Sequence, residues 1–231
     1  MIASLVRLRL YAFVRSGRIA GPVVLGIVAV GILYGGGAVP AGEGYGLSAY
    51  VLLPILAWTT KLLLDTEPDV ARRLAVVAVG RRREIAAGLV AAAIVAVALI
   101  ALAIVLPWAF GGISGPRPHS PDPPLATGIL LGIWAHLVAV PPALALGLLA
   151  SRVVTRTFGY GAFALIGGWL LIVVVGLRQS PVAWLAPPMM AVSRAAHGLV
   201  NGPAEVGVTA WTLGWAVAAM VGYVAFRRRR A

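Results

Sequence analysis

The side chains best suited to chemistry stand close together, in one strongly charged stretch between residues 64 and 88. Four of the seven acidic residues of the chain lie there with five arginines, namely Asp65, Glu67, Asp69, Glu84, Arg72, Arg73, Arg81, Arg82 and Arg83. Clustered carboxylates can hold a divalent cation. Opposite charges on one short helix instead favour contact with another protein. The stretch therefore indicates either a metal-dependent site or a protein-binding surface.

Motifs that would support catalysis by this chain are missing. The only lysine, Lys61, follows two threonines without the glycine-rich approach of a Walker A loop, so we expect no ATP site. The sequence has no cysteine, no His-Glu-x-x-His and no Gly-x-Ser-x-Gly. The histidines 119, 136 and 197 are too dispersed to indicate a metal site. We therefore expect no catalytic residue, and neither a metal nor a cofactor bound by this chain.

The charged stretch partly resembles the signature of CDP-alcohol phosphotransferases, which are small enzymes with six spans. Their pattern is Asp-x-x-Asp-Gly-x-x-Ala-Arg, a spacer, and Gly-x-x-x-Asp-x-x-x-Asp. The matching residues are Ala71, Arg72 and Gly80, with Glu67 and Glu84 in place of aspartates. The mismatches are Leu64, Pro68 and Gly88. The resemblance implies a lipid-modifying enzyme with paired cations, but two of its four carboxylates are missing.

His136 is the one ionisable residue deep inside an apolar run. Such residues line transport pathways or bond a neighbouring helix within the membrane. Two interpretations of His136 therefore stay open: a polar group in a pathway, or a neutral side chain that bonds a carbonyl or hydroxyl on a facing helix. Lys61 lies near the end of another run, four residues before Asp65, and the spacing predicts an ion pair.

Six apolar runs must position these residues. They cover approximately residues 20–36, 46–64, 85–108, 126–150, 158–176 and 206–226, each close to the roughly 20 residues that cross a bilayer. With 61% hydrophobic and 11% charged residues, the composition is that of a membrane protein. We predict an all-α, polytopic integral membrane protein that forms a single transmembrane domain over residues 1–231.

The basic residues set the orientation. Sixteen of the nineteen flank the runs on one alternating set of sides: Arg7, Arg9, Arg15, Arg18, Lys61, Arg72, Arg73, Arg81, Arg82, Arg83, Arg152, Arg156, Arg227, Arg228, Arg229 and Arg230. The other sides hold only Arg117, Arg178 and Arg194. Loops rich in arginine stay in the cytoplasm, so both ends of the chain are predicted to be cytoplasmic. We expect the inner (plasma) membrane of a bacterial cell.

The net charge of +12 would point to nucleic acid in a soluble protein. Here the basic residues lie at membrane boundaries, where they contact lipid headgroups, so lipids are the expected partners and nucleic acid is not.

Three further segments have recognisable patterns. Residues 1–19 mix basic and apolar residues and predict an interfacial helix, although Arg9 falls on the far side of the wheel from Arg7, Arg15 and Arg18. Residues 67–79 predict a cytoplasmic helix that ends at Gly80, with an apolar face of Leu74, Val77 and Ala78. Residues 177–205 are apolar but interrupted by Pro and Gly, and predict two half-helices that dip into the outer leaflet.

This layout resembles the ABC-2-type exporter permeases over the whole chain. The resemblance rests on a basic amphipathic start, six spans, a charged helix between spans two and three, and a half-inserted segment between spans five and six. It implies a permease that pairs with a second permease copy or paralogue and with two separate ATPase subunits, which bind ATP and Mg²⁺. The coupling helix would be residues 67–79, with Glu67, Asp69, Arg72 and Arg73 as contacts to the ATPase.

Under this resemblance the chain forms the translocation pathway for a hydrophobic or amphiphilic substrate and is not itself an enzyme. Two alternatives remain: the lipid-modifying enzyme above, and a membrane partner protein that transports nothing. An ATPase gene beside the gene of this chain would favour the transporter.

Overall fold

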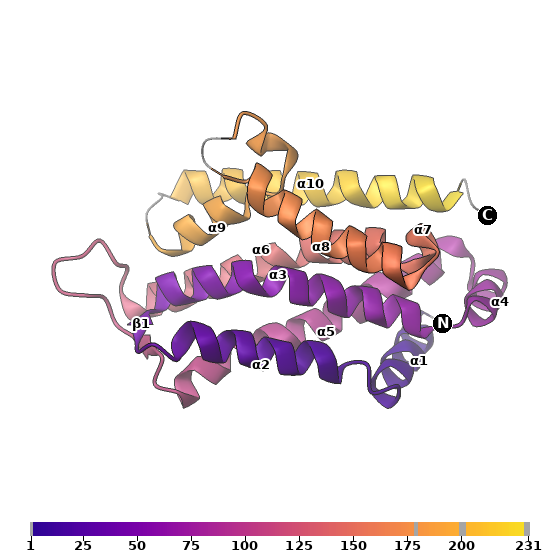
Figure 1. Cartoon of the computed structure of the whole chain (residues 1–231), viewed down its shortest axis with the longest axis horizontal. Helices are drawn as coiled ribbons and strands as arrows, with labels where there is room; N and C mark the ends of the chain where they lie inside the picture. The colour runs from indigo at the N-terminus through magenta and orange to yellow at the C-terminus, as the bar shows by residue number, and fades with distance from the viewer. Residues whose placement is uncertain (1, 178–179, 199–201, 229–231) are drawn as a thin grey trace.

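The computed structural model describes residues 2–177, 180–198 and 202–228 as one bundle of helices (Figure 1). Its elements are α1 (Ile2–Arg15), α2 (Ala20–Tyr34), β1 (Val39–Pro40), α3 (Ala41–Thr66), α4 (Asp69–Val79), α5 (Arg81–Ala109), β2 (Ile113–Ser114), α6 (Leu125–Ala150), α7 (Arg152–Thr155), α8 (Phe158–Val175), the 3-10 turn η1 (Ala183–Leu185), α9 (Met189–Ala196) and α10 (Gly202–Arg228). The expected all-α class is confirmed.

Five of these helices are long and apolar enough to cross a membrane, namely α3, α5, α6, α8 and α10. The run that predicted the first span forms α2, which has only 15 residues. It passes the same test only when it is joined to α1, and the two helices bend by 74° at their junction. The described residues therefore contain five helices that could cross a membrane by length and composition, or six if the bent pair counts as one.

The helices begin and end where local chemistry directs. The Thr157 hydroxyl accepts a hydrogen bond from the backbone N–H of Tyr160 and starts α8, as an N-cap does. Gly80 ends α4 with a φ of +84°, a backbone conformation that favours glycine, and the predicted end is confirmed. Helix α4 starts at Asp69, two residues later than predicted, because α3 continues to Thr66.

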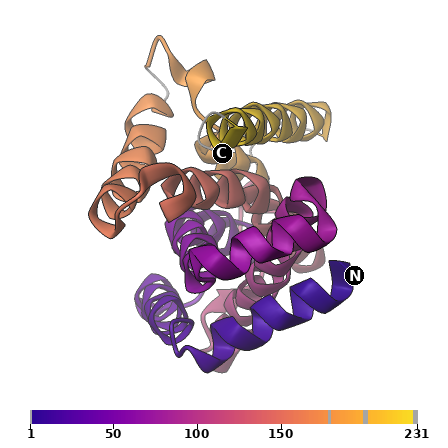
Figure 2. The ribbon, with the colours of Figure 1, turned by 90° about the vertical axis from the view of Figure 1, so that its right-hand side faces the viewer.

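The two ends of the bundle differ in composition. One end, called here the arginine-rich end, holds α1, α4, α7 and both described chain ends (Figure 1). Three arginines of the charge count lie outside the described residues, namely Arg178, Arg229 and Arg230. Figure 2 shows this end from outside: the short helices α1 and α4 lie across it.

Helices α3 and α6 form the centre of the bundle. Of the apolar window of α3, 61% is buried inside the chain, against 17% for α8 and for α10. Glycines bring α3 and α6 together: a Cβ at Gly128 would lie 2.9 Å from the backbone nitrogen of Gly42, and one at Gly132 would overlap Tyr45. Helices without intervening side chains pack closely in this way.

The opposite end is closed by short elements. Strand β1 pairs with β2 in a two-residue parallel ladder. Helix α9 buries Met189, Val192, Ala195 and Ala196 against α3 and α6. In the described part of the segment predicted as two half-helices, residues 177, 180–198 and 202–205, the structure has one short α-helix and one 3-10 turn before α10 starts.

Candidate functional site

The helix at the arginine-rich end, α4, presents an apolar stripe to its surroundings. None of its residues is buried. Val70, Leu74 and Val77 are 69%, 65% and 86% exposed, and their spacing of four and three residues sets them on one face. These exposed apolar side chains are available for contact with lipid or with another protein.

The four charged residues predicted as contacts fall into two groups. Asp69 is 79% exposed and Arg73 is exposed, so both are accessible to a partner. Arg72 and Glu67 are instead turned towards the bundle, with side chains 12% and 15% exposed. The Arg72 guanidinium donates to the Asp69 carboxylate at 3.0 Å. Of the four predicted contact residues, Glu67 and Arg72 therefore face the bundle and hold α4 in place, and Asp69 and Arg73 face outwards.

Glu67 belongs to a group of buried charges centred on Arg9. The Arg9 guanidinium lies 2.6 Å from Glu67 Oε2 and 2.7 Å from Glu84 Oε1, and it also donates to the Glu84 carbonyl oxygen. The Arg9 side chain is 5% exposed. These bonds join α1, the residues just before α4, and the start of α5. They explain why Arg9 lies apart from the other arginines on the helical wheel.

The same geometry bears on the enzyme alternative. Glu67 and Glu84 are the two acids that match the phosphotransferase signature, and the structure does bring them together. A buried guanidinium lies between them, bonded to both. A divalent cation bound by these two carboxylates would have to displace the buried guanidinium that already bonds both of them.

A second buried pair lies at the same end. Lys61 Nζ is 2.6 Å from Asp65 Oδ2, which confirms the ion pair expected from the spacing of four residues. The other oxygen of Asp65 accepts a hydrogen bond from the backbone N–H of Arg152 at 2.8 Å. We call the residues of these two groups the buried ion network: Arg9, Glu67, Glu84, Lys61, Asp65 and Arg152.

His136 lies between α3 and α6 and is fully buried. Its Nδ1 is 2.8 Å from the carbonyl oxygen of Gly132, and its Nε2 is 3.2 Å from the hydroxyl of Ser48 on α3. A carbonyl only accepts, so Nδ1 carries a proton. These contacts support the interhelical interpretation of His136, because no part of the side chain is open to a pathway in this conformation.

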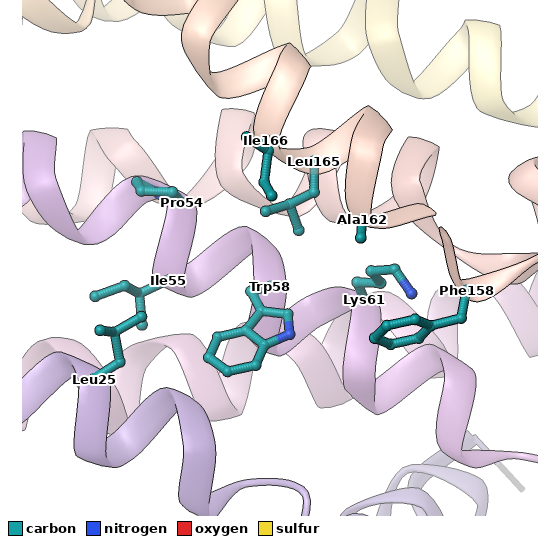
Figure 3. A pocket seen from close by; sticks show the side chains of 9 residues that line it. All are labelled: Leu25, Pro54, Ile55, Trp58, Lys61, Phe158, Ala162, Leu165 and Ile166. Carbon is teal, nitrogen blue, oxygen red and sulfur yellow. The ribbon is translucent and has the colours of Figure 1, made fainter. Parts of the chain in front are cut away.

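A pocket of about 290 Å³ lies between α2, α3 and α8 (Figure 3). Leu25, Trp58 and Leu165 are among its apolar walls. Its one charged residue is Lys61, whose Nζ lies 4.9 Å from the centre of the Phe158 ring. The pocket therefore combines apolar walls with a cation at the arginine-rich end.

Two sets of residues escaped prediction. Arg9 was counted only as a basic residue, although its position on the wheel was a signal that it faces inwards. Glu43, Asp122 and His197 meet at the opposite end. They come from three distant parts of the sequence, and no spacing could have linked them.

Comparisons with protein-family models, with curated proteins and with solved structures gave no match to this chain. Its function must therefore be argued from its own contacts.

Proposed function

We propose that this chain is the permease subunit of an ATP-binding-cassette exporter in the inner membrane of a bacterial cell. The arginine-rich end faces the cytoplasm, as the charge rule requires. Two ATPase subunits, which bind ATP and Mg²⁺, dock on that end. A second copy of the chain or a paralogue completes the permease.

Helix α4 carries the proposal. It combines an exposed apolar stripe with the exposed charges of Asp69 and Arg73, at the end of the bundle where a soluble subunit would dock. Apolar anchors surrounded by charge are typical of protein interfaces. In this proposal Val70, Leu74 and Val77 enter a groove of the ATPase, and the two charges fix the orientation.

The buried ion network provides a mechanical link from that contact. Glu67 precedes α4 directly and is bonded to Arg9 of α1, which is also bonded to Glu84 of α5. A displacement of α4 would therefore move α1 and the start of α5 with it. Rigid-body shifts of packed helices, driven by closure of the ATPase pair, would then change access to the pathway.

The sides of the bundle support a second subunit and an apolar cargo. Helices α8 and α10 leave most of their apolar surface uncovered. The pocket in Figure 3 lies beside α8 and has the size and lining of a site for an apolar chain or ring. Lys61 at its end is bonded to Asp65, so a polar group of an amphiphilic substrate would have to share that ion pair.

Co-expression with the ATPase encoded beside its gene tests the proposal. We expect a detergent-stable complex in which the permease stimulates ATP hydrolysis. The double charge reversal Asp69→Lys with Arg73→Glu should abolish most of that stimulation, because it inverts the exposed charges of α4. It also removes the contact from Arg72 to Asp69, whereas the bond from Arg9 to Glu67 is kept.

The matched control is Arg82→Glu, which reverses an exposed charge at the same end but outside α4. It should stimulate like the unchanged protein. Unimpaired stimulation in the double variant, or the absence of any complex, would remove the basis of the proposal and favour a partner protein that transports nothing.

A further inference from the structure

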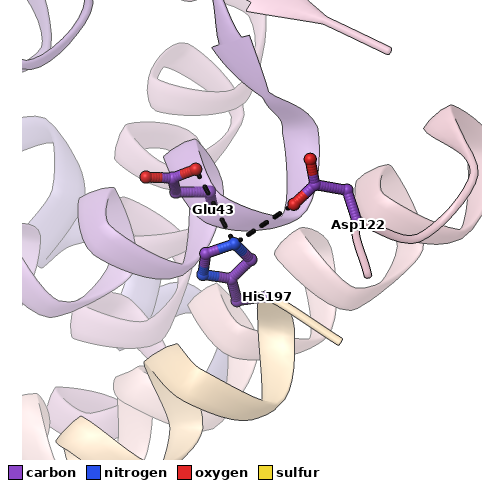
Figure 4. A group of neighbouring side chains, drawn as sticks. All are labelled: Glu43, Asp122 and His197. Atoms are coloured by element: carbon purple, nitrogen blue, oxygen red, sulfur yellow. Dashed lines mark ion pairs between the residues drawn. The ribbon is translucent and has the colours of Figure 1, made fainter. Parts of the chain in front are cut away.

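Three side chains with metal-binding atoms meet at the opposite end of the bundle (Figure 4). Glu43 belongs to the first turn of α3, Asp122 to the loop before α6, and His197 directly follows α9. His197 Nε2 lies 3.3 Å from Asp122 Oδ1 and 3.7 Å from Glu43 Oε2. We call these three residues, together with Arg117, the Glu43 cluster.

The imidazole lies within ion-pair distance of both carboxylates. Figure 4 shows Nε2 directed between the two carboxylates. In the described part of the chain it forms a hydrogen bond with neither of them. Zinc binds histidine nitrogen and carboxylate oxygen at about 2.0–2.2 Å, which sets tetrahedral ligand atoms roughly 3.3–3.6 Å apart. The two measured separations are close to that range.

The charges of the cluster are not balanced. Arg117 lies 2.7 Å from Glu43 Oε2 and 2.9 Å from Asp122 Oδ2, so one cation serves two carboxylates. With a neutral imidazole the cluster keeps one negative charge. The Arg117 side chain is 53% exposed, so it can leave Glu43 for solvent at little cost. Buried Arg9, at the other end, has no such freedom.

The residues around the cluster hold its side chains in fixed positions, as in a metal-binding site. The Asp122 side chain is 1% exposed, and it accepts hydrogen bonds from Ser120 and Arg117 that fix its oxygens. A Cβ at Gly42 would overlap the carbonyl oxygen of Ala196, so α9 presses directly on the start of α3. Oriented ligands of this kind bind metal ions more tightly.

We propose that Glu43, Asp122 and His197 bind a divalent transition-metal ion, for which zinc is the best fit. Three protein ligands leave a fourth position for water or for a group on another molecule. The ion would tie α9 to α3 and to the loop before α6. The proposal goes beyond the transport function and does not depend on it.

The first experiment measures zinc binding to the full chain, purified in detergent without a histidine tag and stripped with EDTA. Competition with a chromophoric chelator should give one Zn²⁺ per chain, and Co²⁺ should give the absorption bands of a near-tetrahedral site. His197→Gln should weaken the affinity roughly tenfold or more, because it removes the nitrogen ligand.

His119→Gln is the matched control, since His119 is an exposed histidine of the same loop as Asp122 and lies outside the cluster. It should bind zinc like the unchanged protein. Glu43→Gln gives a second ligand variant if the histidine variant fails to fold. No zinc binding, or equal affinity in both ligand variants and the unchanged chain, would overturn the proposal.

Arg117→Gln gives a result with the opposite sign. It removes the cation that competes for both carboxylates, so zinc should bind more tightly than to the unchanged chain. If the ion pairs of the cluster serve only to connect α9 with α3 and the loop before α6, this variant would bind no zinc and would only make the contacts of α9 weaker.

Discussion

The two ends of the bundle can be compared charge by charge. Each end places one arginine between two carboxylates: Arg9 bonds Glu67 and Glu84 in the buried ion network, and Arg117 bonds Glu43 and Asp122 in the Glu43 cluster. The two arginines differ in burial, because the Arg9 side chain is 5% exposed and the Arg117 side chain is 53% exposed. A buried arginine between two carboxylates holds helices together, whereas an exposed one can be displaced and leave its carboxylates to another cation.

The largest expected effect is the loss of the cation at the centre of the network. Arg9→Leu would leave Glu67 and Glu84 without the guanidinium that neutralises them, and removal of one partner of a buried ion pair costs about 3–5 kcal/mol. Chemical unfolding in detergent would measure the free energy. Arg7→Leu is the matched control, because Arg7 is an exposed arginine of the same helix. Equal losses in the two variants would mean that the network does not stabilise the fold.

A smaller effect is expected at the edge of the network. The Arg152 side chain is 43% exposed and its Nε lies 3.9 Å from Asp65 Oδ1, so Arg152→Ala should cost only about 0–1 kcal/mol. The backbone N–H of residue 152 would still bond Asp65. The same unfolding assay applies. A loss as large as that of Arg9→Leu would show that the number of ion pairs matters more than their burial.

The smallest effect concerns acid and the Glu43 cluster. Hydrogen bonds from Arg117 hold the pKa of Asp122 well below its usual value of 3.8. A carboxylate with a lowered pKa contributes its full stabilisation above the usual value and loses it only as the pH falls through the lowered one. In EDTA, and in the His197→Gln chain so that the neighbouring imidazole does not contribute, the amide protection factors of α9 should therefore stay constant between pH 7 and pH 5. A fall in the protection of α9 between pH 7 and pH 5 would show that a group other than Asp122 controls its stability in this range.

Helices that are long and apolar enough to cross a membrane were predictable, because the thickness of a bilayer sets the length of such apolar runs. The boundaries of α6 and α8 lie within one residue of the sequence-based ranges. Helix α2 is shorter than its run, because the chain turns towards β1 after Tyr34. Leu74 and Val77 of the exposed apolar stripe of α4 were predicted, with Ala78 in place of Val70. The inward position of Glu67 was not predicted, since its partner Arg9 lies on α1.

The residues of the Glu43 cluster could not be predicted for a different reason. Contacts between distant positions depend on how helices pack, and the sequence gives no period or spacing for them. Glycines showed the same limit. The sequence has several pairs of glycines four residues apart, and their spacing alone does not show which of them lie at helix contacts: Gly128 and Gly132 bring α6 against α3, whereas Gly31 has nothing near it.

The close contact between α3 and α6 restricts how this protein can move. Two backbones in direct contact cannot slide or rotate past each other without a clash, and the bond from His136 to Ser48 fastens them further. Helices α3 and α6 should therefore keep their relative position while other helices move. In the proposed mechanism the helices that move would then be those around this pair, beginning with α1 and the start of α5, which Arg9 joins to the segment before α4.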